Sequence, residues 1–204
     1  FAPDIHWAGI GRLLIGASFQ LAGGRSGPGG RLLLIARHRE GYGNLAELIT
    51  LARSRRPKGE YALGVDDLTC NPTDGPLAHL NGMPGCWAIV PVEPDRDHAA
   101  GPLADGAERT LAQARWAAAT FGERARLGLA LLLHADDSLR SAWAQAASAA
   151  TGLPIVALGD VRMHVRSRKP LADTLTAVRH RAALSACGAV LARNAEQHLR
   201  PRLA

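Results

Sequence analysis

The fold is decided by the stretch from Gly159 to Arg200, which reads GDVRMHVRSRKPLADTLTAVRHRAALSACGAVLARNAEQHLR. Asp160 comes just after the apolar segment 154–158, which has the length of a buried strand. Pro170 then opens a helix, because proline is favoured in the first helical turn, where its missing N–H would have no partner. The order predicts a strand whose carboxyl end carries polar groups, followed by a helix.

On both sides of this stretch and along the rest of the chain, apolar segments alternate with amphipathic ones. Short apolar pieces at 13–15 and 19–21 precede a glycine-rich turn, and further strands are predicted at 31–36, 86–92, 127–133 and 154–158. Helices are predicted at 42–54, 105–120, 136–150 and 171–184. Residues 62–82 are rich in turn formers and are expected to form a surface excursion. The alternation predicts an α/β fold with mostly parallel strands, and about five strands are too few for a closed barrel of about eight.

Composition narrows the function classes. The formal net charge of +6 and the pI near 10.0 favour polyanionic partners. However, aromatic residues make up only 4% of the chain, so the stacking surfaces of a general single-strand binder are not expected. The three cysteines lie far apart and indicate neither a disulfide framework nor a thiolate zinc site. Neither an export signal nor a membrane partner is expected, and the localisation expected is cytoplasmic.

Three stretches carry a resemblance to a known family. They are LLIGASFQL (Leu13 to Leu21), REGYGNLAELITLARSRRPKGEY (Arg39 to Tyr61) and the stretch quoted first. Together they resemble the PHP (polymerase and histidinol phosphatase) domain of bacterial C-family error-prone DNA polymerases, relatives of the DNA polymerase III alpha subunit. The resemblance implies a single partial PHP domain over 1–204, incomplete at both ends. Its fold would be an incomplete, distorted β/α barrel related to the TIM barrel, and residues 185–204 would begin the connection toward the polymerase palm.

The same resemblance implies a function and partners. The parent would be a DNA-directed DNA polymerase, a nucleotidyltransferase active in damage-tolerant translesion synthesis, DNA repair and replication. Its partners would be the remaining polymerase domains, DNA through the parent enzyme, a sliding clamp and mutagenesis accessory proteins. The carboxylates that hold magnesium for polymerisation would lie beyond Ala204, so this chain alone is expected to be inactive, with a structural role and no catalytic residue.

In an intact PHP site, His, Asp and Glu hold divalent zinc, manganese or magnesium ions that activate water against a phosphoester. Here Ser18 stands where ligand-competent members have glutamate, and Arg162 stands where they have histidine. Neutral serine is a poor ligand and arginine repels a divalent ion, so no cofactor is expected in this chain. The remaining candidates for a degenerate metal site are Asp160 and His134. Asp160 is alternatively expected to pair with Arg162.

The basic run is a candidate contact surface. If it is extended, its cations at alternate positions lie on one side, which suits successive phosphates or an acidic neighbouring domain. Contact with nucleic acid or, by resemblance, with the palm is expected from Arg166, Arg168 and Lys169. Two other readings stay open: a metal-dependent phosphoesterase or 3'-5' exonuclease that uses Asp160 and His134, and a basic DNA-contacting module.

Overall fold

The computed structural model describes residues 13–93 and 105–200. They form two compact units, of which the first contains residues 13–93, 105–128 and 143–156, and the second contains residues 129–142 and 157–200. One prediction lies in part outside the described residues, namely residues 201–204 of the connection toward the palm. The single domain over 1–204 stays a prediction.

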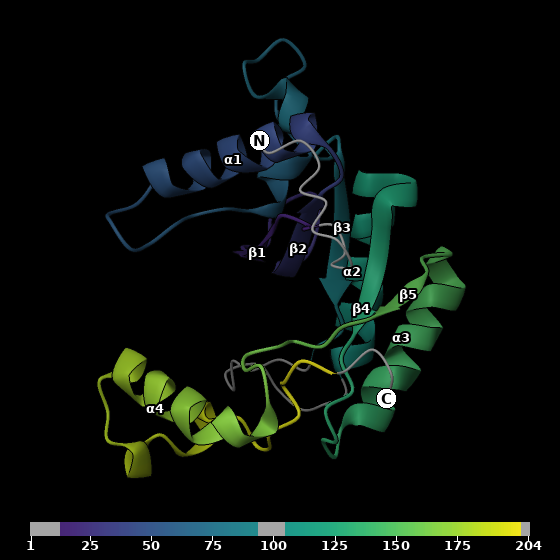
Figure 1. Ribbon diagram of the computed structural model, residues 1–204. Helices are drawn as coiled ribbons and strands as arrows, with labels where there is room; N and C mark the ends of the chain where they lie inside the picture. The colour runs from purple at the N-terminus through teal and green to yellow at the C-terminus, as the bar shows by residue number, and fades with distance from the viewer. Residues whose placement is uncertain (1–12, 94–104, 201–204) are drawn as a thin grey trace. The chain divides into compact units, whose positions relative to one another are not determined.

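Five strands form one sheet in the order β1-β2-β3-β4-β5 (Figure 1). Their bounds are β1 (Gly16–Leu21), β2 (Gly30–Ala36), β3 (Cys86–Pro91), β4 (Ala125–Leu129) and β5 (Ile155–Ala157). The number of strands agrees with the sequence prediction. The prediction of mostly parallel strands is wrong, because β2 is antiparallel to both β1 and β3, whereas β3 and β4 pair in parallel. The sheet is open, with β1 and β5 at its edges.

The connections explain the antiparallel pairs. A short glycine-rich turn joins β1 to β2, and such a turn can only join antiparallel neighbours. The long connection from β2 to β3 returns to the end of the sheet where it started. There the backbone N–H of Arg37 donates to the carbonyl of Gly85 at 2.9 Å, and the Cys86 thiol donates to the carbonyl of Gly41 at 3.3 Å.

Four α-helices have bounds close to those predicted. They are α1 (Arg39–Ser54), α2 (Asp105–Phe121), α3 (Asp137–Thr151) and α4 (Lys169–His180). The predicted helix at 171–184 ends earlier than expected, because Arg181 adopts a left-handed conformation with φ of 50° and closes α4 with hydrogen bonds to Ala177 and Val178. No helix in the described ranges combines the length and the apolar character needed to cross a membrane.

The core of the first unit lies between the sheet and α1. On β2, Leu32 and Leu34 are fully buried, and on α1 so is Leu48. The side chains between them on β2 point to the other face of the sheet and stay half-buried. One face of the sheet is therefore packed, whereas the other is in part accessible.

The apolar run at 127–133 is a strand only in its first half. β4 ends at Leu129, and Leu131 and Leu133 are 48% and 78% exposed. Leu133 has φ of 57°, a backbone conformation that no strand accommodates. The prediction of a strand through Leu133 is wrong for residues 130–133.

Residues 62–82 contain only two short 3₁₀ turns, Val65–Leu68 and Ala78–Leu80. Nevertheless Val65, Leu68 and Leu80 are fully buried. The Asp67 carboxylate holds the first turn in place. It accepts two hydrogen bonds of 2.8 Å from Arg55 and one of 2.8 Å from the backbone N–H of Gly64. This segment runs without long elements, yet it contributes to the core.

The Asp67 cap gives a pH prediction. Burial opposes ionisation of Asp67, but the hydrogen bonds from Arg55 and Gly64 outweigh it and lower the pKa of the carboxyl. A lowered folded-state pKa stabilises the fold above the unfolded value of about 3.9, and this contribution is lost as pH falls through the folded value. Asp67→Asn is therefore expected to cost about 1 kcal/mol at pH 7 and less at pH 3.

Urea unfolding of both proteins at pH 7 and pH 3 measures this difference. Asp74→Asn is the matched control, because Asp74 is an exposed aspartate of the same segment. An Asp67→Asn cost that is the same at both pH values would contradict the prediction.

Candidate functional site

Three of the four residues at metal-ligand positions of the predicted site belong to the second unit. His134 follows β4 and is half-buried, and Asp160 follows β5 with φ of 40°. The Asp160 carboxylate accepts a hydrogen bond of 2.5 Å from the Gln197 side chain. Arg162 is exposed, and its pairing with Asp160 stays a prediction. Ser18 lies in the first unit, on β1, where its hydroxyl accepts a hydrogen bond of 3.1 Å from Arg31.

The structure gathers a ligand-competent group around His134 that the sequence did not predict. His134, Asp136 and Asp137 each offer one ligand atom, and these atoms lie within 4.8 Å of one another. All three residues are half-buried, and two carboxylates with an imidazole are ligands that divalent zinc or manganese accepts. This group could hold a metal ion. Asp160 is not a member of it.

A guanidinium already occupies the middle of this group. Arg140 is 4% exposed, and its Nη2 atom lies 2.5 Å from Asp137 Oδ1, 3.3 Å from Asp136 Oδ1 and 3.2 Å from His134 Nδ1. The other terminal nitrogen donates to the carbonyl of Ala130 at 3.1 Å. The arginine thus contacts all three potential ligands through one nitrogen atom.

These contacts also engage the imidazole. Arginine can only donate hydrogen bonds, so His134 Nδ1 is the acceptor in its 3.2 Å contact with Arg140. The Nδ1 lone pair is then engaged with Arg140, as are one oxygen of Asp136 and one of Asp137. A metal ion that used these atoms would have to displace a buried, permanent cation. The electrostatic task of a metal, neutralising two adjacent carboxylates, is performed by Arg140.

The sequence held a signal for this arrangement. Asp136 and Asp137 stand at the start of the helix predicted at 136–150, where negative charge is favourable near the positive end of the helix dipole. Arg140 stands four and three residues after them, the spacing at which side chains meet on a helix. The participation of His134 could not be predicted, because it depends on how the chain turns between Leu129 and Asp137.

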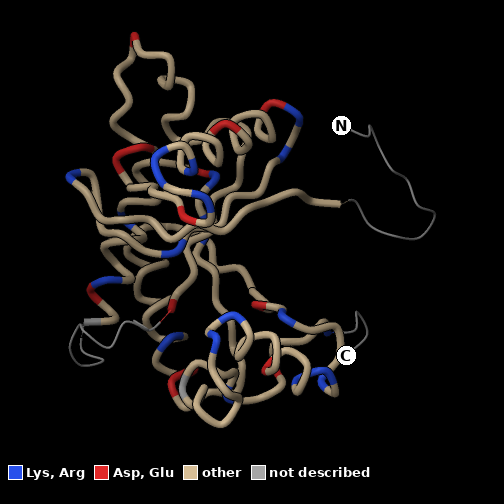
Figure 2. The backbone as a smooth tube through the Cα atoms, turned by 90° about the vertical axis from the view of Figure 1, so that its left-hand side faces the viewer, with Lys and Arg blue, Asp and Glu red and all other residues tan. Residues whose placement is uncertain are grey.

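The basic run does not form an extended ladder. Arg166–Arg168 is a 3₁₀ turn and α4 starts at Lys169. The segment is therefore not extended there, and its cations are not aligned on one side. Arg166 pairs with Glu196 at 3.0 Å, and Lys169 pairs with Asp173 at 2.5 Å. Among the described residues, Arg168 is the cation of the three without an ion-pair partner. Figure 2 shows Lys and Arg positions at many places along the backbone and not in this run alone.

No family model matches the chain. Curated relatives match nearly all of it. It is 51% identical over 191 residues to the error-prone DNA polymerase of Bordetella parapertussis, covering 94% of this chain and 17% of that protein. The corresponding enzyme of Burkholderia mallei is 46% identical over 212 residues, covering 98% of this chain and 19% of the relative. The error-prone DNA polymerase of Ralstonia nicotianae is 45% identical over 195 residues, covering 94% of this chain and 17% of the relative. The chain thus spans less than a fifth of the relatives it matches, and it is similar over almost all of its own length to proteins named error-prone DNA polymerase.

Proposed function

We propose that the chain is the PHP-domain segment of an error-prone DNA polymerase and that its role there is structural. The observation that carries the proposal is the 51% identity to such a polymerase over 94% of the chain. Because the matched region is 17% of the relative, we assign nucleotidyl transfer to the remainder of the parent enzyme. The incomplete, distorted barrel remains part of the proposal, and the open five-stranded sheet is compatible with it.

The structural role is supported by the charge arrangement in the second unit. Arg140 takes the central position among the three potential ligands, and Arg162 stands where the family resemblance implies a histidine. Arg162 thus puts a permanent cation where a metal-binding imidazole would stand. Arg140 puts a permanent cation where a metal ion would lie. The segment would then hold neighbouring domains rather than perform hydrolysis.

The proposed partners follow from the parent enzyme. They are the other polymerase domains, DNA engaged through the parent during translesion synthesis, a sliding clamp and mutagenesis accessory proteins, all in the cytoplasm. Residues 185–204 would begin the connection to the palm. Of the basic run, Arg168 is the residue we propose for contact with that domain, since Arg166 and Lys169 are engaged by acids of this chain.

A chimera tests the proposal directly. Residues 1–204 replace the matching segment of the Bordetella parapertussis polymerase, and primer extension is measured on undamaged and damaged templates. Extension within about threefold of the unmodified enzyme is expected, because half of the segment is identical. A chimera that is soluble and folded but cannot extend primers would contradict the assignment. Exchanging the same segment for an unrelated α/β domain of equal length is the control.

A second candidate function rests on the His134, Asp136 and Asp137 group: a metal-dependent phosphoesterase or 3'-5' exonuclease, with Asp160 near the same strand ends. Purified chain is incubated with manganese and either bis(p-nitrophenyl) phosphate or a 3'-labelled oligonucleotide. The structural proposal predicts no hydrolysis above that of Asp160→Ala and His134→Ala variants. Hydrolysis by the unmodified chain that both variants lose would favour the phosphoesterase.

A further inference from the structure

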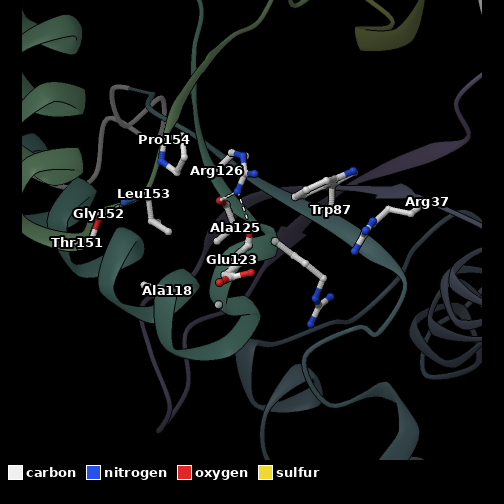
Figure 3. Close-up of a pocket in the computed structure, with 12 residues that line it drawn as sticks. Arg37, Trp87, Ala118, Glu123, Ala125, Arg126, Thr151, Gly152, Leu153 and Pro154 are labelled. Atoms are coloured by element: carbon white, nitrogen blue, oxygen red, sulfur yellow. Dashed lines mark hydrogen bonds between the residues drawn. The ribbon is translucent and has the colours of Figure 1, made fainter.

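A stack of arginine, tryptophan and arginine lies on the accessible face of the sheet. The register places Trp87 opposite Ile35, and Arg126 opposite Ile89, so the side chains of Arg37, Trp87 and Arg126 share one face. The guanidinium carbons of Arg37 and Arg126 lie 4.7 Å and 4.6 Å from the centre of the indole ring. Figure 3 shows Trp87 between the two arginines.

The stack borders a cavity of about 640 Å³, of a size that holds small ligands. All residues that line it belong to the first unit. Arg124 contributes a third guanidinium, and Glu123 is the one acid among the described residues that line the cavity. No ion pair between Glu123 and any of the three arginines is present among the described residues. Positive charge is therefore in excess.

The three arginines are not equivalent. Arg124 is structural, because it donates to the carbonyls of Met83 and Gly82 at 2.6 Å and of Cys86 at 3.0 Å. Burial lowers the pKa of Arg124, and the neighbouring charge of Arg37 lowers it further. Arg126 donates from Nη1 to the carbonyls of Glu123 and Ala125, and its contact with Trp87 leaves the remaining donors of its fork at the edge of the stack. Arg37 is exposed, and its guanidinium contacts the indole ring.

Such an arrangement is preorganised for phosphate. Contact with the ring restrains the position of each guanidinium, and the fork of N–H donors of arginine suits two-pronged binding of phosphate oxygens. The indole ring attracts each guanidinium through a cation–π interaction, but it does not neutralise the positive charge. A merely structural role would not require two arginines on one ring beside an open cavity in which three arginines face a single acid.

We propose that Arg37 and Arg126, held on Trp87, bind phosphate groups of a DNA strand. The inference deepens the proposed function, and it rests on that function only for the choice of DNA as the phosphate source. It places the DNA contact of this chain on the sheet face of the first unit, and not on the basic run at Arg166 to Lys169. A free nucleotide shares the same phosphate chemistry and is separated from DNA by the experiment.

The experiment measures binding of a labelled single-stranded 12-mer by fluorescence anisotropy at several salt concentrations, using the whole 204-residue chain. The Arg37→Gln/Arg126→Gln double variant is expected to bind roughly tenfold or more weakly, with a salt slope lower by about 1–2. The matched control, Arg166→Gln/Arg168→Gln, removes the same two charges and is expected to bind within about twofold of the unmodified chain. If the double variant is unfolded by circular dichroism, Arg37→Gln alone is used, since that side chain is exposed.

Three results would overturn the proposal. They are DNA binding unaffected by the Arg37 and Arg126 changes, an equal loss in the Arg166 and Arg168 control, and no DNA binding by the unmodified chain. Competition by a deoxynucleoside triphosphate or inorganic phosphate distinguishes the sources. Saturable nucleotide binding without DNA binding would mean that the site takes free nucleotides, contrary to the proposal. None of these results alters primer extension by the chimera, so the two proposals can fail independently.

Discussion

Arg140→Ala is expected to lower the free energy of unfolding by about 3–5 kcal/mol, because it leaves two adjacent carboxylates in a partly buried site without their cation. The same change should create a metal site. With Arg140 removed, His134 Nδ1 and one oxygen each of Asp136 and Asp137 become available within 4.8 Å of one another. Manganese at about 100 times its dissociation constant should then restore about 2.7 kcal/mol of stability. Thermal and urea unfolding with and without manganese measure both effects.

Two variants control this experiment. Arg168→Ala removes a charge from an exposed arginine and is expected to change stability by no more than about 0.5 kcal/mol. The triple change Asp136→Asn/Asp137→Asn/Arg140→Ala removes the carboxylates with the cation, so it should lose the stabilisation by manganese. Arg140→Ala that is as stable as the unmodified chain, or manganese stabilisation that survives in the triple variant, would contradict the account.

Gly41→Ala is expected to destabilise the chain by about 1–3 kcal/mol or more, through steric conflict between α1 and the start of β3. A Cβ atom at position 41 would lie 2.0 Å from the carbonyl oxygen and 2.5 Å from the carbonyl carbon of Gly85. Both are backbone atoms, so relief requires the helix to move away from the sheet. The close approach also sets the Cys86 thiol against the Gly41 carbonyl. Urea unfolding at pH 7 measures the cost.

Gly43→Ala is the matched control in the same helix. A Cβ there meets no atom within 4 Å, so the change is expected to stabilise α1 by about 0.5–1 kcal/mol through helix propensity alone. The two substitutions differ by only two positions in EGYGNL, yet their effects should have opposite signs. Equal effects of the two would mean that the close approach at Gly41 has no energetic importance.

Element positions could be predicted where the local pattern decides them. The helix predicted at 136–150 is found as α3, which is followed by Gly152 with φ of 74°, and Pro170 lies in the first turn of α4 as expected. The helix expected from Tyr42 begins earlier, at Arg39, because the His38 side chain accepts the N–H of Gly41 and serves as a cap. This places the glycines of the EGYGNL motif inside the helix and not in a phosphate-binding turn.

Strand direction and the site depended on contacts that no local pattern contains. The direction of β3 follows from a connection that returns to its starting point, which a count of alternating strands and helices cannot detect. The candidate site contains the predicted His134, but its partners are Asp136, Asp137 and Arg140 and not Asp160. The family resemblance predicted Asp160 as the partner of His134. The acids that lie beside His134 are Asp136 and Asp137, and Arg140 in the first turn of α3 balances their charge.

Manganese content of the unmodified chain tests the central claim most directly. The chain is dialysed against manganese at neutral pH, freed of unbound ion and analysed for metal per polypeptide, beside His134→Ala and Asp136→Asn. If Arg140 is the cation that balances Asp136 and Asp137, the unmodified chain retains far less than one manganese ion per polypeptide. The two variants then retain as little manganese as the unmodified chain. One or more ions held per chain, and lost in both variants, would mean that imidazole and carboxylate bind metal in spite of the guanidinium.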